Sequence, residues 1–155
     1  MNNPDNPFPV RKPLRHATPR LSLGMSPAYF ITICAEDRTC APFLAVADAV
    51  LSSARFYHEK GRWFLHLLVV MPDHLHLILQ VPPSTDLART VGNWKRYLVR
   101  THGLRLQTNF FDTRLRDEAH FTEKWNYMVN NPVSRKLVSE PGQWPYVLKA
   151  PDMSR

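Results

Sequence analysis

The sequence predicts an α+β domain of the ferredoxin-like type, in which a split βαβ antiparallel sheet is flanked by helices and followed by an extra C-terminal helix. Hydrophobic periodicity between residues 29 and 131 gives the order strand, helix, strand, strand, helix, strand, helix. The second and third strands are separated only by Pro72 and Asp73, so we expect an antiparallel hairpin. In this topology the strand that starts at His74 lies inside the sheet, beside the first strand.

The first half of this pattern is formed by four segments. Residues 29–35 are β-branched and aromatic and predict the first strand. Apolar residues recur at helical spacing over 43–57, and Gly61 follows as a stop. Residues 63–71 and 74–81 are apolar enough to form the two strands of the hairpin.

The second half begins with Ser84, Thr85 and Asp86, which offer helix N-caps before an apolar stripe over 87–98. Gly103 is placed to end that helix, and residues 109–115 predict a fourth strand. Asp117 and Glu118 suit the start of the last helix. We expect that helix to end at Asn131-Pro132, because a residue before proline is biased away from helical geometry.

Composition indicates a basic protein with one folded domain. The 155 residues carry 20 Lys and Arg against 13 Asp and Glu, a net charge of +7, which favours nucleic acid as a partner. We expect a Pro-rich basic arm over 1–26, the folded domain over 27–147 and a tail over 148–155. The two cysteines give no disulfide framework, and no signal peptide or membrane span is recognised, so we expect a cytoplasmic protein without a membrane partner.

His74 and His76 form the first candidate site. Strand side chains alternate between faces, so both imidazoles point the same way while Leu75 points toward the core. The pair can converge on one metal ion. Two histidines at this spacing are more commonly a solvated or hydrogen-bonded pair. A histidine-triad hydrolase would have a third histidine at position 78, where this chain has Ile78.

Tyr127 and Asn131 form the second candidate site. They are four residues apart on the last helix and therefore share a face. An amide oxygen can bind a hard metal ion, and a phenol one turn away could lie beside a metal-bound phosphate. The alternative is that Tyr127 packs and Asn131 caps the helix end.

Basic side chains gather in the second half of the sequence, with few carboxylates between them. Such a track could follow a phosphate backbone, although a solvated helix face is the alternative. The candidate DNA-binding residues are Arg89, Lys95, Arg96, Arg100, Arg114, Arg116 and Lys124.

Several segments together resemble the REP-associated tyrosine transposases, members of the single-tyrosine HUH superfamily. The segments that carry this resemblance are Val69–Leu77 (VVMPDHLHL), Trp94–Tyr97 (WKRY), Phe110–Glu118 (FFDTRLRDE), Glu123–Val133 (EKWNYMVNNPV) and Trp144–Tyr146 (WPY). Their order and spacing extend over residues 29–146, most of the chain.

The resemblance implies a metal-dependent enzyme that cleaves and rejoins single-stranded DNA near hairpins. It implies that Tyr127 is the catalytic nucleophile and that His74, His76 and Asn131 bind the metal, expected to be Mg²⁺ or Mn²⁺. A monomer or a homodimer is consistent with it. At Asp73 the family commonly has asparagine, and we expect this position to face away from the histidines.

Two other classes of protein stay open. A non-catalytic binder of single-stranded nucleic acid could use the same ferredoxin-like sheet, although such modules present exposed aromatic residues on the central strands. An unrelated metal-dependent phosphodiesterase could use the histidines without forming a tyrosyl adduct.

Overall fold

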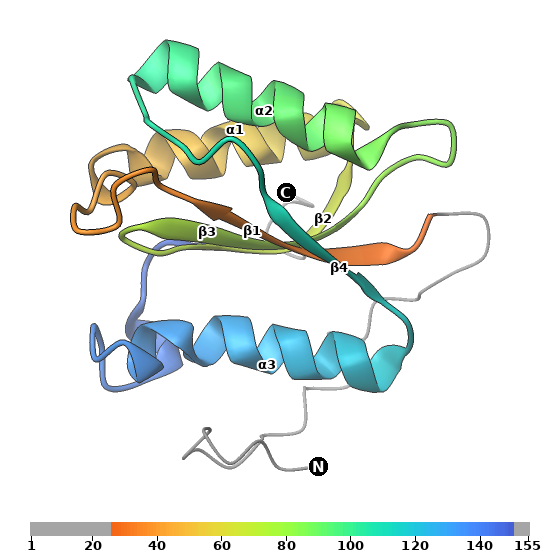
Figure 1. The fold of residues 1–155 in the computed structure, drawn as a ribbon. Helices are drawn as coiled ribbons and strands as arrows, with labels where there is room; N and C mark the ends of the chain where they lie inside the picture. Colours follow the sequence, from red (N-terminus) through yellow and green to blue (C-terminus); the bar gives the residue numbers. More distant parts are fainter. Residues whose placement is uncertain (1–25, 151–155) are drawn as a thin grey trace.

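The computed structural model describes residues 26–150 and shows a five-stranded antiparallel sheet in the order β4-β1-β3-β2-β5 (Figure 1). The expected arm over 1–26 lies outside this range except for Ser26. The elements are β1 (Ala28–Cys34), the 3-10 helix η2 (Leu44–Val46), α1 (Ala47–Glu59), β2 (Phe64–Val70), β3 (His74–Gln80), α2 (Leu87–His102), β4 (Phe111–Leu115), α3 (Glu118–Ser134), the 3-10 helix η3 (Pro141–Gln143) and β5 (Val147–Lys149). The predicted ferredoxin-like sheet with an extra C-terminal helix is confirmed.

The helix boundaries follow the local signals in the sequence. The side chain of Asp86 caps α2 by accepting from Arg89 N, and Gly103 ends that helix in the left-handed region at φ 67°. Asp117 caps α3 by accepting from His120 N at 2.8 Å. Because Asp117 caps α3, this helix starts three residues after the end of β4. The chain therefore passes from α2 on one face of the sheet, through β4, to α3 on the other face (Figure 1).

The sheet separates two hydrophobic layers. Helices α1 and α2 cover one face, and α3 alone covers the other (Figure 1). Leu75, Leu77 and Leu79 of β3 belong to the larger core under α1 and α2. Leu67, Ile78 and Met128 belong to the smaller core, which lies under α3. All seven residues of β3 are buried, so this strand contributes side chains to both layers.

Two features of the C-terminal region differ from the sequence-based expectation. The prediction that Asn131-Pro132 ends α3 is wrong, because the helix continues to Ser134. Pro132 lacks only its own backbone N–H, so the helical hydrogen bonds beyond it can still form. Arg135 N, for example, donates to Asn131 O at 3.0 Å. The short strand β5 was not expected. It pairs with the outer edge of β2, and the boundary placed at residue 147 falls inside it.

Within residues 26–150 no helix combines the length and apolar character required to cross a bilayer.

Met128 anchors α3 to the sheet, since its side chain is fully buried in the smaller core. Met128→Ala should lower the free energy of unfolding by about 2–5 kcal/mol, because it removes buried methylene groups and leaves a cavity. Denaturant titration followed by circular dichroism measures this change. Glu123→Ala on the exposed side of the same helix is the control, and an equal loss in both variants would contradict the packing role of Met128.

Candidate functional site

The two histidines of β3 meet on the face of the sheet that α3 covers. Their Nε2 atoms are 3.0 Å apart, and both residues are buried, with exposed fractions of 3% and 4%. The pleat of β3 produces this arrangement, since the intervening Leu75 points to the opposite core. The two ring nitrogens that could bind an ion are therefore directed at the same point.

The other nitrogen of each ring is held by a polar side chain. His74 Nδ1 lies 2.7 Å from Asp73 Oδ1, and His76 Nδ1 lies 3.0 Å from the hydroxyl of Thr32 on β1. The expectation that Asp73 faces away from the histidines is wrong. Face alternation applies only within a strand, and Asp73 belongs to the turn before β3 begins at His74.

Asp73 also contacts two arginines from distant parts of the chain. Arg38 Nε donates to its Oδ2 at 2.9 Å, and Arg135 Nη2 lies 3.8 Å from its Oδ1. Burial raises the pKa of Asp73, but the hydrogen bonds with His74 and Arg38 outweigh that effect and hold the pKa below its ordinary value. Asp73 is therefore ionised at neutral pH and can only accept hydrogen bonds.

Both histidines are neutral at pH 7. Burial lowers the pKa of His74 below its ordinary value, although Asp73 opposes the shift. Burial and the nearby His74 lower the pKa of His76 to about 3. Since the Asp73 carboxylate only accepts, His74 carries its proton on Nδ1 and leaves the Nε2 lone pair free. A neutral imidazole with a free lone pair is the form that binds metal ions.

Tyr127 on α3 packs against His76 of this pair. Its ring centroid is 5.4 Å from that of His76 and 6.1 Å from that of Phe30, and the residue is 49% exposed. Lys124 Nζ, one turn earlier on α3, lies 5.9 Å from the centre of the Tyr127 ring. A solvent-accessible phenol therefore stands next to a buried histidine pair, with a cation beside it.

Asn131 has a free acceptor suited to a metal site. It follows Tyr127 by one turn on the same face of α3 and is only 6% exposed. Its Oδ1 is buried and has no hydrogen-bond partner among the described residues. A buried oxygen without a protein partner is unfavourable unless water or a bound ion satisfies it. Residues 26–150 contain no cluster of three His, Cys, Asp or Glu that could hold a metal ion.

The structure distributes the predicted DNA-binding cations over both faces of the sheet. Lys124 is on α3, whereas Arg89, Arg96 and Arg100 are on α2. Arg114 pairs with Tyr29, which packs into the core under α1 and α2, so it also faces away from Tyr127. Arg116 lies in the link between β4 and α3.

Lys95 differs from the other predicted cations. It is 7% exposed, and its ammonium donates to Gln107 O at 2.7 Å and to Thr108 O at 3.0 Å. Within residues 26–150, none of the predicted DNA-binding cations forms an ion pair with a carboxylate.

Four residues around the site were not identified from the sequence as site residues. Thr32 and Phe30 face His76 because β1 pairs with β3 in that register, and Asp73 and Arg38 meet at the hairpin turn. Alternation along β1 could have suggested Thr32 and Phe30. No local pattern marks Arg38.

Comparison with known proteins places the chain in a family. Residues 26–131, more than half of the chain, match the family model "Transposase IS200 like". The chain therefore belongs to the IS200-like transposase family.

Individual relatives agree with this assignment. The chain is 25% identical over 136 residues to the "Putative REP-associated tyrosine transposase" of Haemophilus influenzae, covering 76% of this chain and 77% of that protein. It is 24% identical over 131 residues to the "REP-associated tyrosine transposase" of Escherichia coli, covering 82% and 79%. The solved "Structure of the REP associates tyrosine transposase bound to a REP hairpin" shares the fold with a TM-score of 0.72 at 21% identity, covering 84% of this chain and 81% of that one. The resemblance to REP-associated tyrosine transposases is confirmed.

The Asp73–His74 contact makes a prediction about the protonation of the histidine ring. In ¹⁵N-labelled protein, long-range ¹H–¹⁵N spectra should show His74 with its proton on Nδ1. Asp73→Ala should shift His74 toward the Nε2-protonated form that free imidazole prefers, whereas Asp73→Asn should preserve the wild-type form because its amide oxygen still accepts. His58, whose Nδ1 accepts from Leu65 N at 3.1 Å, is the internal control. An unchanged His74 in Asp73→Ala would refute the positioning role of Asp73.

Proposed function

We propose that this chain cleaves and rejoins single-stranded DNA, with Tyr127 as the nucleophile and a divalent ion, Mg²⁺ or Mn²⁺, bound by His74, His76 and Asn131. The observation that carries the proposal is the contact between a half-exposed tyrosine ring and a buried, neutral histidine pair whose Nε2 atoms face each other. The unpartnered Oδ1 of Asn131 on the same helix supports the choice of the third ligand.

The residues of the chain have distinct roles in this reaction. When bound, the ion supplies Lewis-acid chemistry that polarises the scissile phosphate. The Tyr127 oxygen attacks the phosphorus atom, forms a 5′-phosphotyrosine bond and releases a 3′ hydroxyl. A 3′ hydroxyl that attacks the same phosphorus reforms the DNA and frees the phenol, so no nucleotide cofactor is consumed. The ammonium of Lys124 lies where it attracts the phosphate to the phenol.

Thr32 allows His76 to become a metal ligand. Without an ion, His76 donates from Nε2 to the free Nε2 of His74, and its Nδ1 accepts from the Thr32 hydroxyl. To expose the Nε2 lone pair, His76 must move its proton to Nδ1. The Thr32 oxygen then accepts instead of donating, since a hydroxyl does either. The contact at 3.0 Å suits both forms of the ring.

Hairpin-forming DNA is the substrate we propose. The solved relative with the same fold was captured with a REP hairpin, and this chain carries a net charge of +7. Arg89, Arg96 and Arg100 of α2 and Lys124 of α3 have no carboxylate partner within residues 26–150 and are available for phosphates, whereas Lys95 is bonded to two backbone carbonyls. A binding protein without catalysis and a phosphodiesterase without a covalent intermediate are the competing functions, and both predict that no tyrosyl adduct forms.

Tyr127→Phe should abolish formation of the covalent adduct while leaving hairpin affinity within about twofold, because the ring still packs but the attacking oxygen is gone. The measurement is a denaturing gel of end-labelled hairpin DNA incubated with protein and Mn²⁺. Tyr97→Phe is the matched control, since Tyr97 is also exposed, at 42%, but lies on α2. Normal adduct formation by Tyr127→Phe would assign the attack to another group.

His76→Ala should lose at least tenfold in affinity for Mn²⁺, because it removes one of the three proposed donors. Electron paramagnetic resonance of free Mn²⁺ in the presence of hairpin DNA measures this affinity independently of cleavage. His66→Ala is the control, because this buried histidine bonds Gln80 and lies outside the site. Equal Mn²⁺ affinity in wild type and His76→Ala, or full cleavage in excess chelator, would rule out the proposed metal site.

A further inference from the structure

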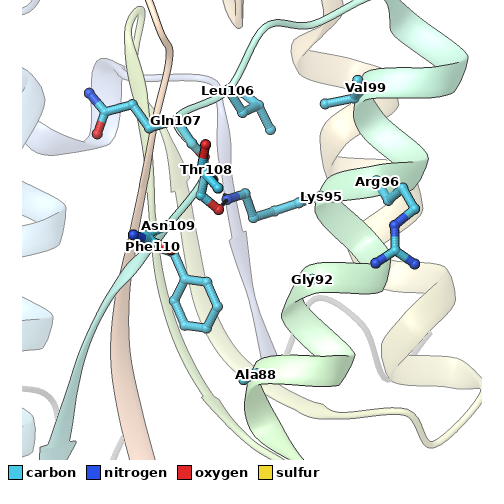
Figure 2. Close-up of a pocket in the computed structure, with 10 residues that line it drawn as sticks. All are labelled: Ala88, Gly92, Lys95, Arg96, Val99, Leu106, Gln107, Thr108, Asn109 and Phe110. Atoms are coloured by element: carbon cyan, nitrogen blue, oxygen red, sulfur yellow. Dashed lines mark hydrogen bonds between the residues drawn. The ribbon is translucent and has the colours of Figure 1, made fainter.

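A concave site lies on the face of the sheet opposite α3, the helix that carries Tyr127. It is bounded by α2 and by the segment 106–110 that leads into β4, and its volume is about 490 Å³ (Figure 2). This volume falls in the range of small-ligand pockets. The lining residues are Ala88, Gly92, Lys95, Arg96, Val99, Leu106, Gln107, Thr108, Asn109 and Phe110.

Small residues and a buried lysine create the hollow. Ala88 and Gly92 present no long side chain on this face of α2, and a Cβ built at Gly92 would meet no atom within 4 Å. Lys95 extends from α2 to the opposite wall, where its two hydrogen bonds to the carbonyls of Gln107 and Thr108 fix the position of that segment (Figure 2). The pocket is thus held open by the fold itself.

The lining chemistry fits one nucleotide. Phe110, Leu106 and Val99 offer apolar surface on which a base can pack, and no Asp or Glu lines the pocket. Arg96 is exposed, and its only hydrogen bond among the described residues is to Asn93 Oδ1 on its own helix, at 3.2 Å. A guanidinium with free donors can bind the phosphate of a nucleotide, and an aromatic ring beside it can stack on the base.

We propose that this pocket binds a nucleotide of the single strand that flanks the hairpin, with its phosphate on Arg96 and its base against Phe110. The proposal rests on the proposed function, since it assigns a second contact to the same DNA. If one nucleotide of the flank binds in this pocket, the pocket helps to determine which single-stranded flanking sequences the protein binds.

The route from this pocket to the catalytic face crosses β4, an edge strand. Phe110 lines the pocket, and the next residue, Phe111, is 66% exposed and pairs with Thr32, which in turn bonds His76. Directly paired residues in antiparallel strands share a face, so Phe111 stands on the side of Tyr127. Phe110 and Phe111 therefore lie on opposite sides of the edge strand β4. Bases of a single-stranded DNA that passes around this edge can stack on each of them in turn.

The test compares two probes bound to the Tyr127→Phe protein, so that cleavage plays no part. One probe is the hairpin alone, and the other is the hairpin with single-stranded flanks on both sides. Arg96→Gln and Gly92→Leu should each weaken binding of the flanked probe by about tenfold and leave the hairpin alone unchanged. Fluorescence anisotropy measures both affinities. Gly92→Leu should fold, since leucine favours helix and the added side chain enters open space.

Matched controls come from α1. Arg55→Gln and Ser52→Leu make the same kinds of change at exposed positions outside the pocket and should leave both probes unaffected. The proposal is overturned if the Tyr127→Phe protein binds the two probes equally, if the pocket variants made in it keep the preference for the flanked probe, or if they weaken binding of both probes alike. Failure of the proposed function is seen in different results. Either wild type forms no tyrosyl adduct, or neither probe binds. If neither probe binds, the pocket proposal fails as well.

Discussion

The pleat of β3 is the constraint on which the rest of the structure depends. One strand places Leu75, Leu77 and Leu79 in the core under α1 and α2 while it places His74 and His76 under α3. Because the period of a strand is two, a shift of one residue would bury the imidazoles under α1 and α2 and turn the leucines toward α3. Pairing with β1 on one side and β2 on the other fixes the register.

The site combines a neutral interior with a charged perimeter. Burial favours the uncharged form of both His74 and His76, which is the form of imidazole that can bind a metal ion. Around them, Arg38 and Arg135 meet at Asp73, and Lys124 lies over Phe30 and Tyr127. The single ionised carboxylate of Asp73 therefore has two effects. It holds the His74 ring in a fixed protonation state, and it holds two cations beside the histidine pair, where we propose that a polyanion binds.

Much of the fold could be predicted from the sequence because its signals are local. Caps, the apolar stripe of α2 and the hairpin at Pro72-Asp73 each occupy a few consecutive residues, and all appear in the structure. The convergence of His74 and His76 needed only the strand period. The contacts of Asp73 could not be predicted, since they depend on how Arg38 and Arg135 return to one turn from distant segments.

The positions of the predicted DNA-binding cations also depend on contacts between distant segments, which the sequence does not reveal. Spacing alone suggested one track, but the pairing of Arg114 with Tyr29 turns it to the face opposite Tyr127. That pairing is set by the register of β4 on β1, which no local pattern reports. Strand β5 was missed for a related reason. The three residues 147–149 are too few to show a strand period, and they are ordered by long-range contacts, namely pairing with β2 and burial of Leu148 in the larger core.

The two edges of the sheet differ in how they are protected from unwanted self-association. An unpaired strand exposes backbone donors and acceptors that can recruit a second sheet. At one end of the sheet β5 pairs with Leu67–Val69 of β2, so the edge strand there is only three residues long. At β4 no strand is added within the described residues, but the strand is short and carries the opposite charges of Asp112 and Arg114. Short length and charge are two of the features by which natural edge strands discourage pairing with a second sheet, and β4 has both.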